Sequence, residues 1–168
     1  DTRAAAYFAR ALGGSLEIVE ATVRVNERQR TRMVDKIEQA VGGSLAGKTI
    51  CLLGLSFKPE TDDMRDAPSI DIARGLATRG AAIRAFDPVA MRAAEPHLPG
   101  VTLCKDAYQA CEGADAAVIV TEWNQFRLLD LERARLSLRR PLMIDLRNVY
   151  DPKEMRDAGW TYACVGRK

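Results

Sequence analysis

Hydrophobic and polar residues follow two different periods along this chain. Up to about residue 45, apolar positions recur every three or four residues, which is the spacing of one face of an α-helix. An Ala-rich segment over residues 1–12 predicts a first helix that ends at Gly13-Gly14. A second helix is predicted from Ser15, as its N-cap, to about Val41.

The second helix carries a heptad-like stripe. Its members are Leu16, Val19, Val23, Asn26, Arg30, Met33 and Ile37. A helix of this span is about 40 Å long, which exceeds what a small domain needs for its own core. Asn26 and Arg30 interrupt the apolar stripe, as polar residues do where they fix the pairing of two helices. We therefore expect a helix–helix interface, within a dimer or between domains; the alternative is a middle section that faces water.

From Lys48 onward, short apolar runs alternate with helical segments. Strands are predicted at 49–54, 82–86, 116–121, 142–145 and 161–165, and helices at 68–78, 89–95, 106–112, 130–138 and 153–158. Buried strands separated by helices indicate an α/β fold with a doubly wound parallel sheet, Rossmann-like, preceded by the long helical segment. The predicted division is a helical segment at 1–45 and an α/β domain at 46–168.

Composition narrows the classes of function. Of the 168 residues, 25 are Lys or Arg and 23 are Asp or Glu, so the net charge of +2 argues against nucleic acid as the main partner. The densest basic run, 24–32, is interpreted as a solvated helix face or a protein interface, with a phosphate groove as the alternative. Hydrophobic residues make up 47% of the chain, and no apolar run is long enough to cross a membrane.

The cysteines and the N-terminus suggest a reduced compartment. None of the four cysteines forms a Cys-x-x-Cys pair, and the single histidine, His97, has no Cys or His at ligand spacing, so no metal site is expected. The chain opens on Asp1 without an initiator Met or a secretory signal. We expect a cytoplasmic protein whose first residue lies inside a longer sequence.

Loops after the strands are the expected ligand sites of such a sheet. The loop after the first strand contains one glycine, Gly54, and is too long for the tight turn of a dinucleotide-binding unit. Asp87, at the end of the second strand, occupies the place where such folds bind a ribose; its alternative role is that of a turn former. Trp123, after the third strand, either covers a flat ring or packs against a neighbouring loop.

Cationic side chains at this edge suggest an anionic ligand. Lys58 and Arg65 belong to the first loop, and Ser69 falls in the first turn of the next helix, whose amides attract anions. Arg147 follows the fourth strand, and its guanidinium suits a phosphate. The alternative is that Lys58 and Arg65 are solvated charges balanced by neighbouring acids.

Four segments, in this order, carry a resemblance to a known family. They read Gly-Leu-Ser-Phe-Lys-Pro-Glu-Thr-Asp-Asp-Met-Arg (54–65), Phe-Asp-Pro (86–88), Thr-Glu-Trp (121–123) and Ile-Asp-Leu-Arg-Asn-Val-Tyr-Asp-Pro (144–152). With them the whole chain resembles the UDP-glucose dehydrogenase family, a group of nucleotide-sugar dehydrogenases. The resemblance implies an N-terminal NAD-binding domain and a catalytic cysteine that precede this sequence, a central helix that forms a homodimer, and a C-terminal domain that binds the UDP-sugar.

The resemblance also implies roles for individual residues. Asp1 matches the active-site aspartate that assists the water or alkoxide chemistry, and Phe57 and Lys58 match residues that hold the UDP-sugar. Arg65 matches an arginine that reaches towards NAD, and Arg147 one that contacts the nucleotide sugar.

One departure from the family pattern is Leu146, where relatives often have Gly. Without the cysteine and the NAD domain, the 168 residues are expected to be inactive alone. The alternatives are a dehydrogenase of GDP-mannose or of a UDP-N-acetyl sugar, and a non-catalytic dimerising interaction module. A nicotinamide-binding domain in its own right is disfavoured by the missing glycine pattern.

Overall fold

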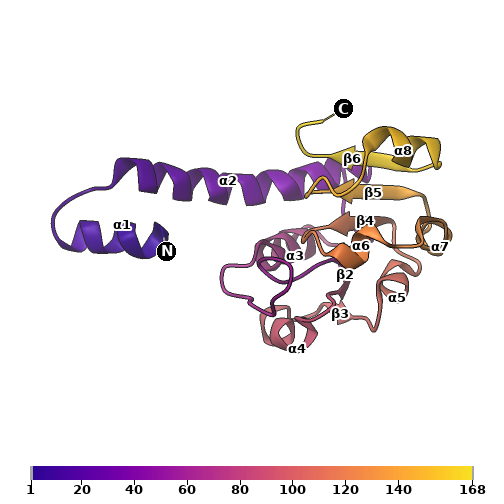
Figure 1. Ribbon diagram of the computed structural model, residues 1–168, viewed down its shortest axis with the longest axis horizontal. Coiled ribbons are helices and arrows are strands. Elements are labelled where there is room, and N and C mark those ends of the chain that lie inside the picture. Colours follow the sequence, from indigo (N-terminus) through magenta and orange to yellow (C-terminus); the bar gives the residue numbers. More distant parts are fainter. Residues whose placement is uncertain (1, 168) are drawn as a thin grey trace.

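The computed structural model describes residues 2–167 and shows two helices followed by an α/β domain (Figure 1). The two helices are α1 (Thr2–Ala11) and α2 (Glu17–Ala40). The strands are β1 (Thr49–Leu53), β2 (Ala82–Phe86), β3 (Thr102–Leu103), β4 (Ala116–Ile119), β5 (Leu142–Asp145) and β6 (Thr161–Cys164). The further helices are α3 (Pro68–Thr78), α4 (Met91–Ala94), η1 (Glu95–His97), α5 (Ala107–Cys111), α6 (Asn124–Arg127), α7 (Leu131–Ser137) and α8 (Pro152–Asp157).

The strands form one parallel sheet, so the predicted fold class is confirmed. Their order is β3-β2-β1-β4-β5-β6, with the chain crossing from one half of the sheet to the other between β3 and β4. The sequence pattern missed β3, because this edge strand has only two residues and neither is buried. In such a sheet the ligand site lies at the carboxyl ends of the strands near the change of direction, which here is the edge next to β1 and β4.

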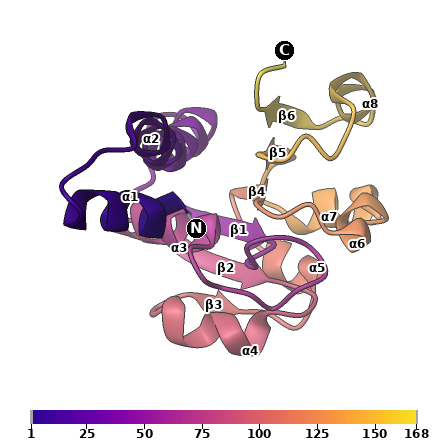
Figure 2. The same cartoon turned by 60° about the vertical axis from the view of Figure 1, so that its left-hand side comes forward.

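Both faces of the sheet are buried under helices. On one face, α3 and the second half of α2 pack against side chains of β1 such as Ile50 and Leu52. On the other face, α5, α7 and α8 pack against Cys51 and Leu53. Figure 2 shows α2 and α3 on one side of the sheet and α5 to α8 on the other. Because both faces of the central strands are buried, their sequences are continuous apolar runs and do not alternate between apolar and polar residues.

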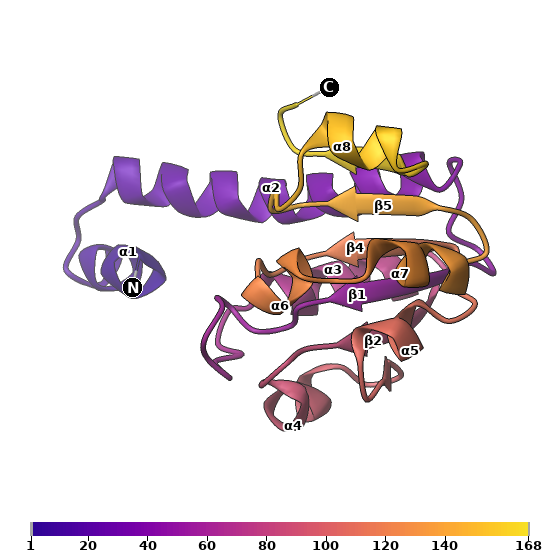
Figure 3. The ribbon, with the colours of Figure 1, turned by 45° about the vertical axis from the view of Figure 1, so that its right-hand side comes forward.

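The second helix has two unlike halves. Val34 and Ile37, in its C-terminal half, belong to the same hydrophobic core as the sheet. Its N-terminal half extends beyond the sheet (Figure 3), and α1 runs back beside it in the opposite direction (Figure 1). Arg10 of α1 pairs there with Glu20 of α2, the Nε and Oε1 atoms being 3.0 Å apart. The predicted division of the chain at residue 45 stays a prediction. The C-terminal half of α2, which precedes that boundary, packs into the core of the α/β domain that follows it.

The predicted N-cap of the second helix is wrong. The helix begins at Glu17, its N-cap is Leu16, and no side chain forms a capping hydrogen bond. Ser15 lies one residue too early to be the cap. Glu17 and Glu20 lie in the first turn instead, where carboxylates interact favourably with the exposed amides of a helix N-terminus.

The contact between α2 and α3 depends on a glycine. A Cβ atom on Gly75 would lie 2.8 Å from Cγ2 of Val34, which is closer than packed carbon atoms approach. At one end of this contact, Arg79, the C-cap of α3, donates to Asp35 (2.7 Å) and to Glu38 (2.5 Å) of α2. The two helices are therefore held at a fixed, close spacing.

Within residues 2–167, none of the helices combines the length and the apolar character needed to cross a bilayer.

Candidate nucleotide-sugar site

A cavity of about 310 Å³ lies between α2 and the carboxyl ends of β1, β4 and β5. It is lined by Asn26, Gln29, Arg30, Met33, Phe57, Pro68, Ile72, Val120, Leu146, Arg147 and Val165. Two of the predicted substrate-binding residues, Phe57 and Arg147, therefore come together although they are far apart in the sequence. Apolar walls with a few polar groups are typical of sites for small organic ligands.

The turn after β1 is built on a close backbone approach. Gly54 has a φ of +91°, and a Cβ atom there would lie 2.6 Å from the backbone nitrogen of Thr121. The Thr121 hydroxyl donates to the carbonyl of Ser56 at 2.7 Å. These contacts bring the loop between β1 and α3, residues 54–67, against the end of β4. We refer to it below as the β1–α3 loop.

A buried carboxylate organises the start of the β1–α3 loop. Asp87 is fully buried at the end of β2, and its Oδ2 accepts hydrogen bonds from the backbone amides of Leu55 (2.7 Å) and Ser56 (3.1 Å). Its Oδ1 accepts from the amides of Val89 (2.9 Å) and Ala90 (2.7 Å). Both oxygens are engaged by protein donors, so the ribose-binding interpretation of Asp87 is wrong and its role as a turn former is confirmed.

Trp123 belongs to the same arrangement. Its side chain is buried, and the indole N–H donates to Oδ2 of Asp87 at 3.1 Å. The packing interpretation of Trp123 is therefore confirmed. Ser69 is also buried, and its hydroxyl donates to the carbonyl of Leu55. Ser69 lies in the first turn of α3, as predicted, and its hydroxyl closes the loop.

A second buried carboxylate organises the loop between β5 and α8, residues 146–151, which we call the β5–α8 loop. Asp145 is fully buried and accepts hydrogen bonds from the backbone amides of Arg147 (2.9 Å), Val149 (2.7 Å) and Tyr150 (3.1 Å). The Tyr162 hydroxyl donates to the same carboxylate at 2.6 Å. Burial and this bond raise the pKa of Tyr162 above its ordinary value. The carboxylate thereby fixes the backbone from which the Arg147 side chain leaves.

The guanidinium of Arg147 is paired with Glu122. Nε and Nη2 donate to the two carboxylate oxygens at 2.6 and 2.7 Å, a bidentate arrangement. This hydrogen bonding lowers the pKa of Glu122 and raises that of Arg147. The arginine side chain remains 47% exposed. A phosphate could therefore approach it and take over the contacts that the carboxylate makes.

The remaining predicted site residues lie elsewhere. Lys58 is exposed, and within residues 2–167 its ammonium group has no hydrogen bond or ion pair; it does not line the cavity. Arg65 is 91% exposed and donates to Asp63, with Nη2 and Oδ2 2.7 Å apart, which lowers the pKa of Asp63 to about 2. Asp1 lies outside the described residues.

Comparison with known proteins decides the family. A sequence model described as the UDP-glucose/GDP-mannose dehydrogenase family, UDP binding domain, matches residues 51–152. The chain belongs to this family. The resemblance seen in the sequence is thereby confirmed, and six of the eleven residues that line the cavity belong to the matched domain.

Individual relatives are similar over nearly the whole chain. A UDP-glucose 6-dehydrogenase of Rhizobium meliloti (strain 1021) is 43% identical over 152 residues, which are 90% of this chain and 35% of that protein. The solved structure of a UDP-glucose dehydrogenase from Pyrobaculum islandicum has a TM-score of 0.78 at 32% identity and covers 96% of this chain and 35% of that one. An NDP-N-acetyl-D-galactosaminuronic acid dehydrogenase from Methanosarcina mazei has a TM-score of 0.79 at 25% identity and covers 92% of this chain and 33% of that one. The chain thus spans about a third of the length of these relatives.

Sequence reasoning missed the contribution of α2 to the cavity. Asn26 and Arg30 were interpreted as polar breaks in a stripe that faces a partner helix, yet in the structure they line the cavity of their own chain, together with Gln29. In the structure this stripe faces the sheet, since Ile37, which belongs to it, is fully buried in the core. Asn26 and Arg30 lie on this stripe nearer the start of α2, at the carboxyl ends of the strands, and therefore reach the cavity.

Proposed function

We propose that this chain is the nucleotide-sugar-binding and dimerisation part of an NAD-dependent UDP-glucose 6-dehydrogenase, which oxidises UDP-glucose to UDP-glucuronate in two successive steps. The observation that carries the proposal is the cavity that joins Phe57 and Arg147 at the carboxyl ends of the strands. Support comes from the family match over 51–152 and from relatives named UDP-glucose 6-dehydrogenase.

The chemistry of the cavity fits a nucleotide diphosphate. Phe57, Met33 and Leu146 offer apolar surface to a flat base or a ribose, and the amides of Asn26 and Gln29 can exchange hydrogen bonds with polar edges. In the proposed complex, a phosphate takes the bidentate contacts of Arg147 from Glu122. Lys58, on the same loop as Phe57, adds a second positive charge, and Leu146 narrows the space beside Arg147.

The sheet of this chain does not fit the dinucleotide itself. The turn after β1 is long and lacks the glycine pattern, and both oxygens of Asp87, which would have to bind a ribose, are occupied by protein donors. In our proposal NAD is bound mainly by a part of the enzyme outside this sequence. Arg65, which is exposed at the outer side of the β1–α3 loop, is the residue proposed to reach it.

The nucleophile is also proposed to lie outside the sequence. All four cysteines of the chain are buried, and burial raises the pKa of the Cys51 thiol. A buried thiol that holds its proton is a poor nucleophile. We therefore expect no reduction of NAD by the 168 residues with UDP-glucose, while Asp1 remains the proposed acid–base residue of the complete site.

The helical segment is proposed to form the homodimer through residues 15–41. Six exposed large apolar side chains lie on α1, on the connection that follows it and on the N-terminal half of α2: Tyr7, Phe8, Leu12, Leu16, Ile18 and Val25. Exposed apolar side chains that lie close together are typical of protein interfaces. In this proposal the enzyme works in the cytoplasm on a small-molecule substrate, without nucleic acid or membrane as partner.

Binding of UDP tests the proposal. In calorimetry and thermal unfolding, UDP at about 100 times its Kd should add roughly 2.7 kcal/mol to the unfolding free energy. Arg147→Gln should weaken binding at least tenfold, since a charged bidentate contact is lost. Lys153→Gln, an exposed charge change on α8, is the matched control.

The alternatives give different outcomes in the same experiment. Stronger binding of GDP than of UDP would favour a GDP-mannose dehydrogenase. A dimer in light scattering that binds neither nucleotide would favour the interaction module and contradict the proposal.

A further inference from the structure

One arginine of the helical segment joins α2 to the β1–α3 loop. Arg30 donates from Nη1 to Oδ1 of Asp66 (2.9 Å) and to Oδ2 of Asp71 (2.5 Å), and from Nη2 to the backbone carbonyl of Asp66 (3.0 Å). Its side chain is only 16% exposed. Asp66 belongs to the loop and Asp71 to α3, so a single guanidinium connects three elements.

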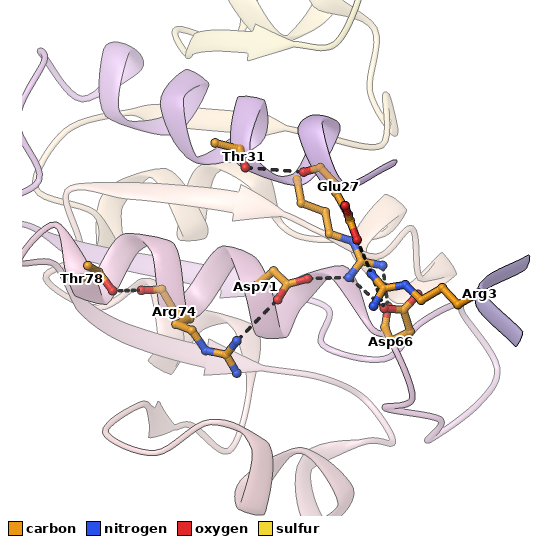
Figure 4. A network of polar contacts seen from close by, with 8 residues as sticks. Arg3, Glu27, Thr31, Asp66, Asp71, Arg74 and Thr78 are labelled. Atoms are coloured by element: carbon orange, nitrogen blue, oxygen red, sulfur yellow. Dashed lines mark hydrogen bonds and ion pairs between the residues drawn. The ribbon is translucent and has the colours of Figure 1, made fainter. Parts of the chain in front are cut away.

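The residue that Arg30 holds has an unusual backbone. Asp66 has a φ of +57°, in the left-handed region that costs a residue other than glycine free energy. Arg30 binds both the carbonyl and the carboxylate of this residue. Nη2 of Arg3, in α1, lies 3.7 Å from Oδ1 of the same Asp66 carboxylate and 3.4 Å from Oε1 of Glu27, in α2. Figure 4 shows Arg3, Glu27, Asp66 and Asp71 converging at this point from the helices and the loop.

Anchoring at Asp66 acts on the whole β1–α3 loop. The residue directly precedes Ala67, the N-cap of α3, so it fixes where the loop returns to the helix. Inside the loop, the amide of Phe57 donates to the carbonyl of Asp63 at 2.8 Å, and the amide of Ala67 donates to that of Met64 at 3.2 Å. Since Asp63 and Met64 are adjacent, these two hydrogen bonds connect the anchored end of the loop with Phe57.

Arg30 also lines the same cavity as Phe57 and Arg147. We propose that Arg30 is a positioning residue: through Asp66 it holds the β1–α3 loop, and with it Phe57 and Lys58, in the geometry that binds the nucleotide diphosphate. The inference rests on the proposed function. It assigns to the helical segment a role in substrate binding in addition to dimerisation. A loop that is already ordered binds a ligand more tightly, because binding then costs less conformational entropy.

The chain offers a matched control at the other end of the same helix pair. Arg79, directly after α3, binds Asp35 and Glu38 of α2, as Arg30 of α2 binds Asp71 of α3, but within residues 2–167 Arg79 has no hydrogen bond or ion pair with the β1–α3 loop. Arg30→Gln and Arg79→Gln should therefore lower the melting temperature by similar amounts. Only Arg30→Gln should weaken UDP binding, by about tenfold, while Arg79→Gln should stay within about twofold.

A conservative variant and a ligand-free measurement complete the experiment. Arg30→Lys should have intermediate affinity, since an ammonium group cannot reproduce the planar fork that binds a carbonyl and two carboxylates. Hydrogen exchange of the amides of residues 57–67, without nucleotide, should accelerate in Arg30→Gln and not in Arg79→Gln. If Arg30→Gln does not fold, Asp66→Asn removes the loop charge, keeps a residue that tolerates positive φ, and should weaken UDP binding about threefold.

Three results would overturn the inference. These are unchanged UDP affinity in Arg30→Gln, equal loss of affinity in Arg79→Gln, and unchanged exchange of the loop amides in Arg30→Gln. A wild-type chain that does not bind UDP would contradict the proposed function instead. Hydrogen exchange of the amides of residues 57–67 would then decide by itself whether Arg30 anchors the loop.

Discussion

The two loops that border the cavity are held in different ways. In the short β5–α8 loop, three backbone amides bind one carboxylate, Asp145, which comes from the strand directly before the loop. The longer β1–α3 loop is held by groups from distant parts of the sequence: Asp87 after β2, Thr121 after β4 and Arg30 in α2. The amides of the first loop are thus bound by the residue directly before it, although Tyr162, Arg127 and Val165 also contact that loop, whereas the start and end of the second loop are bound by groups from other segments.

Because of this difference, we expect substitutions at the groups that hold the two loops to lower the unfolding free energy by different amounts. A carboxylate that binds amides a few residues away acts within one segment, like an extended cap. Asp87 instead joins the start of the β1–α3 loop to the turn after β2 and to Trp123, so its removal affects three segments at once. The substitutions below test this contrast, from the largest expected effect to the smallest.

Asp87→Ala should cause the largest loss of stability, about 4 kcal/mol of unfolding free energy, because several buried donors lose the carboxylate that accepts from them. Asp145→Ala should cost less, about 3 kcal/mol, since its donors lie mostly in one short loop. Urea unfolding monitored by circular dichroism measures both.

The control for these two variants is Asp151→Ala. Asp151 caps α8 by accepting from the amides of Lys153 and Glu154 but is exposed, so its loss should cost about 1 kcal/mol. If Asp145→Ala is as destabilising as Asp87→Ala, the contrast between the two loops does not hold.

Tyr162→Phe should lower the unfolding free energy by about 1.5 kcal/mol, because the charged acceptor Asp145 loses one donor. The backbone amides that bind Asp145 remain, so the loop keeps its conformation and Arg147 its position. Tyr7→Phe, at an exposed site, should change stability by less than about 0.5 kcal/mol. An effect of Tyr162→Phe as small as that of Tyr7→Phe would show that the bond contributes nothing.

The same tyrosine predicts a pH dependence. Burial and the bond to Asp145 raise the pKa of Tyr162 above its ordinary value of 10.0. The unfolded chain therefore loses this proton at a lower pH than the folded chain, so the stabilisation is complete below about pH 10 and is lost as pH rises further. The difference in stability between wild type and Tyr162→Phe should shrink from about pH 8 to about pH 11. A constant difference over this range would contradict the assignment.

Much of the fold could be predicted from local sequence. The central strands are continuous apolar runs, and the two loops near the cavity carry residues that the family resemblance marks as functional. The two-residue strand β3 was missed because neither Thr102 nor Leu103 is buried. Ser15 was wrongly chosen as an N-cap because sequence alone does not reveal that the helix starts two residues later.

The site was harder to predict, because its contacts are long-range. Arg30 and Asp66 are separated by 36 positions, and Trp123 and Asp87 by the same number. A pattern of residue types does not show that a helical polar residue meets a particular loop, and it left Asp87 with two interpretations. Only the packing of α2 on the sheet settled which of its polar residues face the cavity.

Glu122→Gln should have the smallest effect on stability and a measurable effect on binding. Its ion pair with Arg147 is partly exposed, so the unfolding free energy should change by less than about 1 kcal/mol. Without this carboxylate, Arg147 has no charged competitor for a phosphate, and UDP should bind about threefold more tightly in calorimetry. Glu112→Gln, an exposed charge change away from the cavity, is the control for the altered net charge. Weaker binding by Glu122→Gln would mean that the carboxylate orients Arg147 for the phosphate, so that the position of this side chain, like that of the β1–α3 loop, depends on a group from another segment.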